Sequence, residues 1–225
     1  GRVGKERENL DGSSTDPDSR GIGIEDPYVG PANAGLQADI EAEAAQARSR
    51  YADLKALIAT PELTRLYEVF RSIGVNPKKH PPSIPNLYRY ALKRGCLPSI
   101  NNFVDAYNLI SLRTLFSLGA HDLAALSLPV TMQLFDGSET FIPLGSQEPW
   151  PVTAGEFGYV DADNRVICRL DVVQGEFSKV TDASREVLLI VESTDAMSAE
   201  RQQQVAGEAI GLIQACCGGT AERID

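Results

Sequence analysis

The chain has 225 residues, of which 43% are hydrophobic, enough to bury a sizeable core as one large domain or two small ones. Its net charge of −10 is unlike that of a typical nucleic-acid-binding domain, and no stretch approaches the roughly 18 apolar residues of a membrane span. The first residues lack a signal-peptide hydrophobic region and the four cysteines form no CxxC motif, so we expect a cytoplasmic protein without disulfides, metal or other cofactor.

Residues 1–34 are rich in Gly, Ser, Asp and Pro and lack sustained periodicity. We expect this segment to be extended or disordered, with one weak strand near residues 21–24. The rest of the chain, 35–225, is expected to form a single domain. A long amphipathic helix opens it, predicted from apolar residues at helical spacing: Leu36, Ile40, Ala44, Ala47, Tyr51, Leu54 and Ile58.

Two shorter helices follow. The first begins at Thr60 and Pro61, an N-cap residue followed by proline at the first helical position, and it ends at Gly74. A proline-rich connection leads to the second, over about residues 84–94, which ends at Gly95.

These two helices carry most of the positive charge. Residues 65–95 contain seven basic residues and one acid, a local charge of +6, whereas residues 96–225 contain seven basic and eighteen acidic residues, a charge of −11. The basic segment is either a site for phosphate groups or an ordinary solvated pair of helices.

The next helix, over residues 100–112, is apolar nearly all round and carries a narrow polar stripe. Asn101, Asp105 and Asn108 are spaced i, i+4, i+7, so they share one face. Buried polar groups must find hydrogen-bond partners, because burying them without partners costs free energy. The three residues therefore either tie neighbouring loops together or line a pocket.

After this helix the hydrophobic period changes to two. Strands are predicted at residues 128–134, 139–143, 156–160, 165–171 and 187–192, and a last helix at about 198–215. Helices first and strands later indicate an α+β fold, with a helical N-terminal part packed on a mixed or mostly antiparallel sheet. No nucleophile elbow, phosphate-binding loop or zinc-protease motif is present.

Two motifs around the polar-stripe helix resemble a known family. Residues 97–101 read Leu-Pro-Ser-Ile-Asn, and residues 104–112 contain Val-Asp-x-Tyr-Asn followed by Ser-Leu. Weaker matches follow the family order at 76–77, 82–83, 119–123, 137–141, 159–161, 175–182 and 187–189. Over about residues 60–195 the chain resembles the editing (B-three/B-four) domain of the phenylalanyl-tRNA synthetase beta subunit, and especially its free-standing relatives.

The resemblance implies an editing-domain-like fold that hydrolyses a wrongly attached amino acid from tRNA. In the synthetase, a Glu contacts the wrong amino acid and a His helps to place water. By resemblance Glu176 and His121 are the catalytic residues, although the expected His aligns near Gly119, two residues before His121. An aminoacyl ester is already activated, so its hydrolysis needs a positioned water and oxyanion stabilisation more than a strong nucleophile.

We therefore expect a hydrolase that deacylates mischarged tRNA in trans, and whose partners are the aminoacylated 3′ end and its amino-acid moiety. The residues expected to bind substrate are Asn101, Asp105, Asn108, Ser111, Gly175 and Thr181. The residues expected to contact nucleic acid are Lys78, Lys79, Arg89, Lys93 and Arg94. The alternatives are a non-catalytic module for a free amino acid or related small molecule, and a protein-interaction domain. The sequence indicates no oligomeric state, and it lacks the ATP-binding motifs of a complete ligase.

Overall fold

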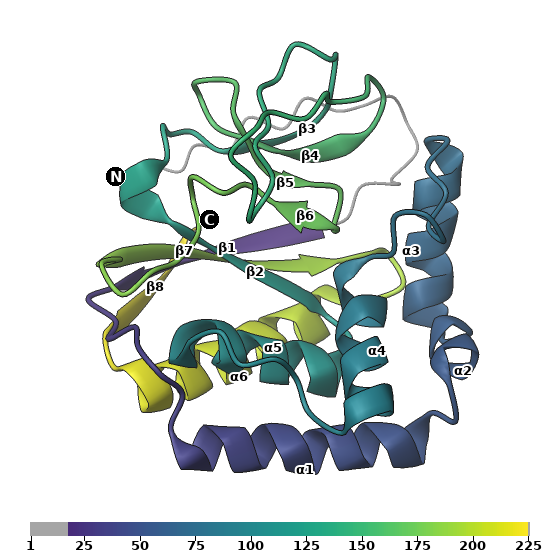
Figure 1. Cartoon of the computed structure of the whole chain (residues 1–225), viewed down its shortest axis with the longest axis vertical. Coiled ribbons are helices and arrows are strands. Elements are labelled where there is room, and N and C mark those ends of the chain that lie inside the picture. Colours follow the sequence, from purple (N-terminus) through teal and green to yellow (C-terminus); the bar gives the residue numbers. More distant parts are fainter. Residues whose placement is uncertain (1–17, 225) are drawn as a thin grey trace.

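The computed structural model describes residues 18–224, which contain two stacked four-stranded sheets (Figure 1). In spatial order, the larger sheet consists of β2 (Ser117–Asp122), β7 (Glu186–Ser193), β1 (Asp18–Glu25) and β8 (Thr220–Ile224). The smaller sheet consists of β3 (Thr131–Leu134), β4 (Phe157–Val160), β5 (Val166–Arg169) and β6 (Val173–Gln174). All neighbouring strands within each sheet are antiparallel, so the α+β class is confirmed, with two sheets in place of one.

Most of the helices cover the face of the larger sheet that points away from the smaller one, and α3 stands beside the edge of the sheets (Figure 1). In chain order they are α1 (Ala34–Arg50), α2 (Leu54–Ile58), α3 (Pro61–Ser72), α4 (Ser83–Arg94), α5 (Asn102–Thr114) and α6 (Ala199–Cys217), with a short 3-10 helix, η1 (Leu123–Ala125), after β2. In Figure 1, α5 and α6 lie directly under the larger sheet and α1 lies below them. Two helices depart from this layer: η1 supplies Leu123 to the core between the sheets, and α3 packs Phe70 against Phe157 of β4.

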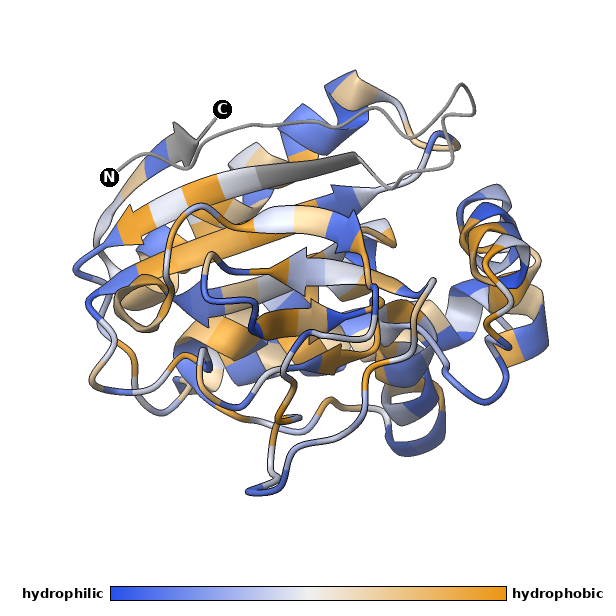
Figure 2. Cartoon of the chain, turned by 90° about the horizontal axis from the view of Figure 1, so that it is seen from above, coloured by the Kyte–Doolittle hydropathy of each residue, from blue (hydrophilic) through white to orange (hydrophobic). Residues whose placement is uncertain are grey.

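Strand β7 contributes to the cores on both sides of the larger sheet. Val187, Leu189 and Val191 pack into the main core with the helices. Leu188 and Ile190 pack between the sheets against residues of the smaller sheet. This two-sided burial explains the unbroken apolar run in β7, and the strands at the centre of Figure 2 are mostly coloured hydrophobic.

The weak strand expected near residues 21–24 is confirmed as part of β1. It pairs with β7 on one side and β8 on the other, so it lies inside the sheet. Ile22 and Ile24 are each 1% exposed and belong to the main core. Residues 1–17 lie outside the described residues, so their expected disorder stays a prediction.

The long helix predicted between Leu36 and Ile58 is wrong, because the structure divides it into α1 and α2. Tyr51 has an extended backbone, and the side chain of Asp53 accepts a hydrogen bond from the N–H of Ala56 at 2.8 Å. This N-cap starts a new helix, which favours the break over continuation.

The next two predicted helices are confirmed. Pro61 opens α3, and α4 stops at Gly95, whose φ of 74° is in the left-handed region.

The segment at 139–143 is not a strand. It makes only isolated bridges, from Thr140 to Arg165 and from Pro143 to Gly175. Strands β2 and β8 were not predicted. Only Leu118 and Ala120 form the apolar face of β2, in alternation with Ser117, Gly119 and His121, so its strand pattern is short and weak.

Candidate functional site

The face of the larger sheet that points to the smaller sheet carries the polar residues of β2. Ser117 pairs with Glu192 across the ladder, and His121 pairs with Leu188. Because Leu188 packs between the sheets and side chains alternate along a strand, Ser117, Gly119 and His121 also face that space. A Cβ added at Gly119 would meet nothing within 4 Å, so the space above this glycine is open.

His121 is buried and hydrogen-bonded at the far end of this row. Its Nδ1 lies 2.9 Å from the Ser178 hydroxyl and 3.2 Å from the Gln174 side-chain nitrogen, which also donates to the Ala120 carbonyl at 2.6 Å. An amide N–H only donates, so Nδ1 accepts and the ring proton is assigned to Nε2. Burial lowers the pKa of His121 to about 3. At neutral pH this histidine is therefore a neutral hydrogen-bond donor and a weak base.

Glu176 lies in the connection that also contributes Ser178 to His121. Its carboxylate accepts a hydrogen bond from the N–H of Gly145 at 2.7 Å and forms an ion pair with Lys179. These contacts, led by the Gly145 N–H, lower the pKa of Glu176. Glu176 thus holds the 143–146 turn against the connection between β6 and β7.

The close packing of this connection explains its glycine. A Cβ at Gly175 would lie 2.7 Å from the Val166 carbonyl oxygen, so the position requires glycine. Further along the connection, the N–H of Thr181 donates to the Ser184 hydroxyl, which itself donates to Asp122 at 2.7 Å. The predicted residues Gly175 and Thr181 therefore shape a loop that packs on the end of β2.

The polar stripe of α5 lies on the other side of the larger sheet. Asn101 is the N-cap of α5 and accepts from the N–H of Val104 at 2.8 Å, so the helix begins one residue after it. Asp105 accepts from the Ser99 hydroxyl at 2.6 Å and from the Ile100 N–H at 2.9 Å. Both side chains thus tie the preceding loop to the helix start, and the structure does not bring them to the connection at residues 175–181.

The two remaining predicted residues of α5 also make no contact with that connection. Asn108 is partly exposed, and within residues 18–224 no hydrogen bond of its side chain is found. Ser111 is 1% exposed, and its hydroxyl has no hydrogen-bond partner among the described residues.

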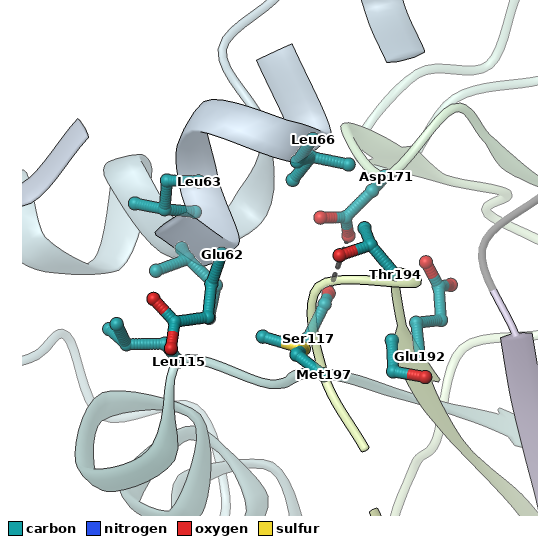
Figure 3. A pocket seen from close by; sticks show the side chains of 11 residues that line it. Glu62, Leu63, Leu66, Leu115, Ser117, Asp171, Glu192, Thr194 and Met197 are labelled. Carbon is teal, nitrogen blue, oxygen red and sulfur yellow. Dashed lines mark hydrogen bonds between the residues drawn. The ribbon is translucent and has the colours of Figure 1, made fainter. Parts of the chain in front are cut away.

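A pocket opens at the other end of the β2 row, between α3, α4 and the ends of β2 and β7 (Figure 3). Its empty volume is about 320 Å³, which includes open solvent at the mouth. Its apolar walls are formed by Leu63, Leu66, Ile84, Leu115 and Met197. The polar residues around it are Glu62, Ser117, Asp171, Glu192, Ser193 and Thr194. None of the residues predicted to bind substrate lines it.

Two carboxylates meet at this pocket. Asp171 is 6% exposed and accepts hydrogen bonds from the hydroxyls of Ser117, at 2.5 Å, and Ser83, at 3.2 Å. Burial raises the pKa of Asp171 to about 6, although the two hydroxyls oppose the shift. Burial and then the charge of Asp171 raise the pKa of Glu192 well above its usual range, and the Tyr159 hydroxyl partly offsets this. Near neutral pH the pair therefore retains protons more readily than solvated carboxylates do.

Sequence reasoning missed both carboxylates. Each lies in a segment predicted as a strand, Asp171 at the end of 165–171 and Glu192 at the end of 187–192. An acid inside a buried apolar run is costly unless it is partnered or functional, and this signal was available in the sequence. Within the described residues, no group of three His, Cys, Asp or Glu residues could hold a metal ion.

Comparison with known proteins identifies the family. The B3/4 domain model matches residues 66–217, which is more than half of the chain. The chain belongs to the B3/4 domain family. The match covers α4, α5, both faces of β7 and the residues around Asp171, so the site described above lies almost wholly inside the family domain.

Among solved structures, this B3/4 domain is similar to the N-terminal fragment of the phenylalanyl-tRNA synthetase beta-subunit from Pyrococcus horikoshii. The TM-score is 0.46 and the sequence identity 11%; the match covers 91% of this chain and 46% of the other. The chain therefore spans less than half of that solved fragment. No curated protein matches this B3/4 domain. Within residues 18–224 no helix has the length and apolar character needed to cross a membrane.

Replacing Glu176 by glutamine tests whether this residue contacts the amino acid or only holds the loop in place. The side chain keeps its volume but loses its charge, so the ion pair with Lys179 is lost while an oxygen remains to accept from the Gly145 N–H. We expect little change in unfolding temperature, because Glu176 is partly exposed. If Glu176 contacts the amino acid, the variant discriminates poorly between tyrosyl- and phenylalanyl-tRNA in a deacylation assay. Unchanged discrimination in the folded variant would reduce Glu176 to a loop-holding role.

Proposed function

We propose that this B3/4 domain hydrolyses the ester bond between tRNA and a wrongly attached amino acid, acting on tRNA charged by another enzyme. The observation that carries the proposal is the family match over residues 66–217, together with the Leu-Pro-x-Ile-Asn and Val-Asp-x-Tyr-Asn motifs inside it. The beta-subunit of phenylalanyl-tRNA synthetase, to which the chain is similar, acts on aminoacylated tRNA, so tRNA and the amino acid at its 3′ end are the proposed partners.

The space between the sheets offers the hydrogen-bonding groups that such a reaction uses. Hydrolysis of an activated ester needs a positioned water and donors for the developing oxyanion. The neutral ring of His121 supplies an Nε2–H donor, held in one orientation by Ser178 and Gln174. The open space above Gly119, between His121 and the pocket, leaves room for a reacting group beside that face of β2.

Four of the five basic residues expected to contact tRNA lie near the two ends of α4, and the fifth, Arg89, lies within the helix. Lys78 and Lys79 precede its first turn, where Ser83 contacts Asp171. Lys93 and Arg94 lie in its last turn, where Arg94 stacks on Tyr90. The 12 residues of α4 separate these ends by about 17 Å, at about 1.5 Å per residue. All four side chains are exposed, so they are free to meet phosphates.

Changing Lys78, Lys79, Lys93 and Arg94 together to alanine should weaken tRNA binding and reduce its salt dependence. Each lost phosphate contact reduces the slope of log affinity against log salt by about 1. The pair Lys78→Ala/Lys79→Ala lies at the pocket end and should account for most of the loss, with the Lys93→Ala/Arg94→Ala pair as its matched control. Filter binding at two salt concentrations measures both effects. Salt-independent binding by the wild-type protein would contradict a phosphate contact.

The decisive experiment is deacylation of a panel of mischarged tRNAs by the full chain. We expect release of one or a few amino acids well above spontaneous hydrolysis, and no release of the matched correct pairs. Absence of hydrolysis across the whole panel would overturn the hydrolase proposal.

A second candidate function is a binding module for a free amino acid or related small molecule. The state of His121 favours it: the ring is buried and neutral, with its Nδ1 already hydrogen-bonded, and this makes it a poor general base. Under this alternative, small amino acids bind the chain but no mischarged tRNA is deacylated.

A further inference from the structure

The pocket beside α3 combines a polar floor with apolar walls. Ser117 and Asp171 are joined by a hydrogen bond of 2.5 Å, and Glu192 is the cross-strand neighbour of Ser117. In Figure 3, Asp171, Thr194 and Glu192 lie on one side of the pocket, and Glu62 and Leu63 of α3 lie on the other. Apart from Glu62, the labelled oxygen-bearing side chains therefore gather on the strand side.

The charges around this pocket are unbalanced. Its lining includes three carboxylates, those of Glu62, Asp171 and Glu192, and no Lys, Arg or His residue. The nearest arginine of α3, Arg65, is already engaged with Asp195 outside the pocket, through hydrogen bonds of 2.6 and 2.9 Å. An ionised Asp171 buried without a cation is expensive, and the partly exposed Glu192 beside it adds to that cost, so a cationic ligand would be stabilised here.

The size of the pocket and its side chains indicate which kind of cation would bind there. The pocket is wide enough to admit a group the size of a water molecule. A divalent metal would require several oxygen ligands around it, and within residues 18–224 no cluster of three suitable side chains exists. A primary ammonium is the size of a water molecule and presents three N–H donors to nearby oxygens.

We propose that this pocket binds the primary ammonium group of an α-aminoacyl ligand, with Asp171 and Glu192 accepting its N–H donors. The inference rests on the proposed function, since an amino acid esterified to tRNA keeps its α-ammonium group free. Leu63, Leu66 and Met197, which line the pocket, would contact the apolar part of the amino acid.

Thr194 offers a hydrogen-bond donor for the acyl group of the same ligand. It is 6% exposed and lines the same pocket, and its hydroxyl accepts a long hydrogen bond of 3.4 Å from the N–H of Ala196. Within the described residues no acceptor is found for the proton of this hydroxyl. An α-aminoacyl group places a carbonyl oxygen two bonds from the carbon that bears the ammonium, and the Thr194 hydroxyl can donate to that oxygen.

The test uses the full chain and two small probes. L-Phenylalanine amide carries the ammonium and the carbonyl, and N-acetyl-L-phenylalanine amide differs mainly by the loss of the cation. At pH 6.5 and low salt, calorimetric titration should show at least tenfold weaker binding of the acetylated probe. Equal binding of the two probes, or binding of neither, would overturn the ammonium site.

Variants assign the binding to the pocket. Asp171→Asn combined with Glu192→Gln should abolish the preference for the free amine, whereas Glu148→Gln, an exposed acid outside the pocket lining, should leave it unchanged. An unchanged preference in the folded double variant would reject these two carboxylates as the site.

A measurement on the wild-type protein covers the case in which the double variant fails to fold. The titratable groups facing Asp171 and Glu192 are Glu62 of α3, Tyr159 of β4 and Cys168 of β5. Because burial raises the pKa of Asp171 to about 6, lowering the pH from 6.5 to 4.5 protonates Asp171 while the amine stays cationic. Amine binding should weaken at least tenfold, and pH-independent binding would contradict the inference.

The same probes separate this inference from the proposed hydrolase. Selective amine binding without any deacylation would keep the ammonium site and remove the hydrolase. Equal hydrolysis of aminoacyl-tRNA and its N-acetylated form would keep the hydrolase and remove the ammonium site.

Discussion

Replacing Asn102 by alanine should lower the free energy of unfolding by about 3 kcal/mol. The side chain is 3% exposed and joins three distant parts of the chain. Its amide nitrogen donates to the carbonyls of Tyr28, at 2.8 Å, and Cys216, at 3.1 Å, and its oxygen accepts from the N–H of Gly30 at 2.8 Å. Alanine would leave these backbone groups without their partner, each at a cost of about 1 kcal/mol or more.

Asn108→Ala is the matched control for this substitution. It removes the same side chain from the same helix, but Asn108 makes no side-chain hydrogen bond within the described residues and is partly exposed. Its unfolding free energy should change by less than about 0.5 kcal/mol. Urea unfolding followed by circular dichroism measures both variants. Equal losses would show that the Asn102 contacts do not stabilise the fold, whereas the expected difference identifies Asn102 as the residue that fastens the β1–α1 linker and the end of α6 to α5.

Asn102 and its neighbours show which features of α5 the sequence pattern predicts and which it does not. Helical spacing correctly predicts the helix and groups Asn101, Asp105 and Asn108 on one face. The pattern does not show that Asn101 lies at the N-cap, where its side chain is used locally. Asn102 does not belong to the stripe. Its partners at positions 28, 30 and 216 come from segments far away in the chain. Periodicity within one helix carries no information about such contacts.

The fold was predictable where local signals agree with the tertiary structure. Pro61, Gly95 and Ser198 mark helix ends that the structure confirms, because caps depend on the nearest few residues. Strand β2 was not predicted because only Leu118 and Ala120 form its apolar face, and its inter-sheet positions are Ser117, Gly119 and His121. Two apolar residues in alternation are too few to distinguish a strand from a loop.

The pocket was the least predictable feature, because it depends on chain pairing. Asp171 and Glu192 are separated by 21 positions in the sequence, and only the meeting of the two sheets with α3 brings them to one cavity. Their raised pKa values follow from burial, which the sequence gives only indirectly. The resemblance to the editing family pointed to His121 and Glu176, and it carried no signal for this pair.

The unfolding free energy of the Asp171→Asn variant should increase relative to that of wild type as the pH rises. The pKa of Asp171 is raised to about 6 in the folded protein, from an ordinary value of 3.8. A carboxyl with a raised folded pKa contributes stability that is fully present below the unfolded value and is lost as the pH rises through the folded value. Above pH 6 the ionised, buried carboxylate therefore destabilises the folded wild-type protein, and the asparagine variant lacks this destabilisation.

The expected quantity is the change with pH in the difference between variant and wild-type unfolding free energies. Asparagine disturbs the hydrogen bonds from Ser117 and Ser83 by a similar amount at every pH, so that loss is a constant offset. The difference should move in favour of the variant by about 2 kcal/mol between pH 4 and pH 7, because one pKa unit corresponds to about 1.4 kcal/mol. Urea unfolding at four pH values over this range measures it.

Asp195→Asn provides a control of opposite sign. Its hydrogen bonds with Arg65 lower the pKa of Asp195, so its contribution is present above the unfolded value and is lost as the pH falls. That variant should therefore lose stability relative to wild type as the pH rises. A flat difference for Asp171→Asn over pH 4 to 7 would show that its carboxyl is not destabilised by burial. A rising difference that disappears when L-phenylalanine amide is added would connect the cost of the buried carboxylate directly to the ammonium ligand that relieves it.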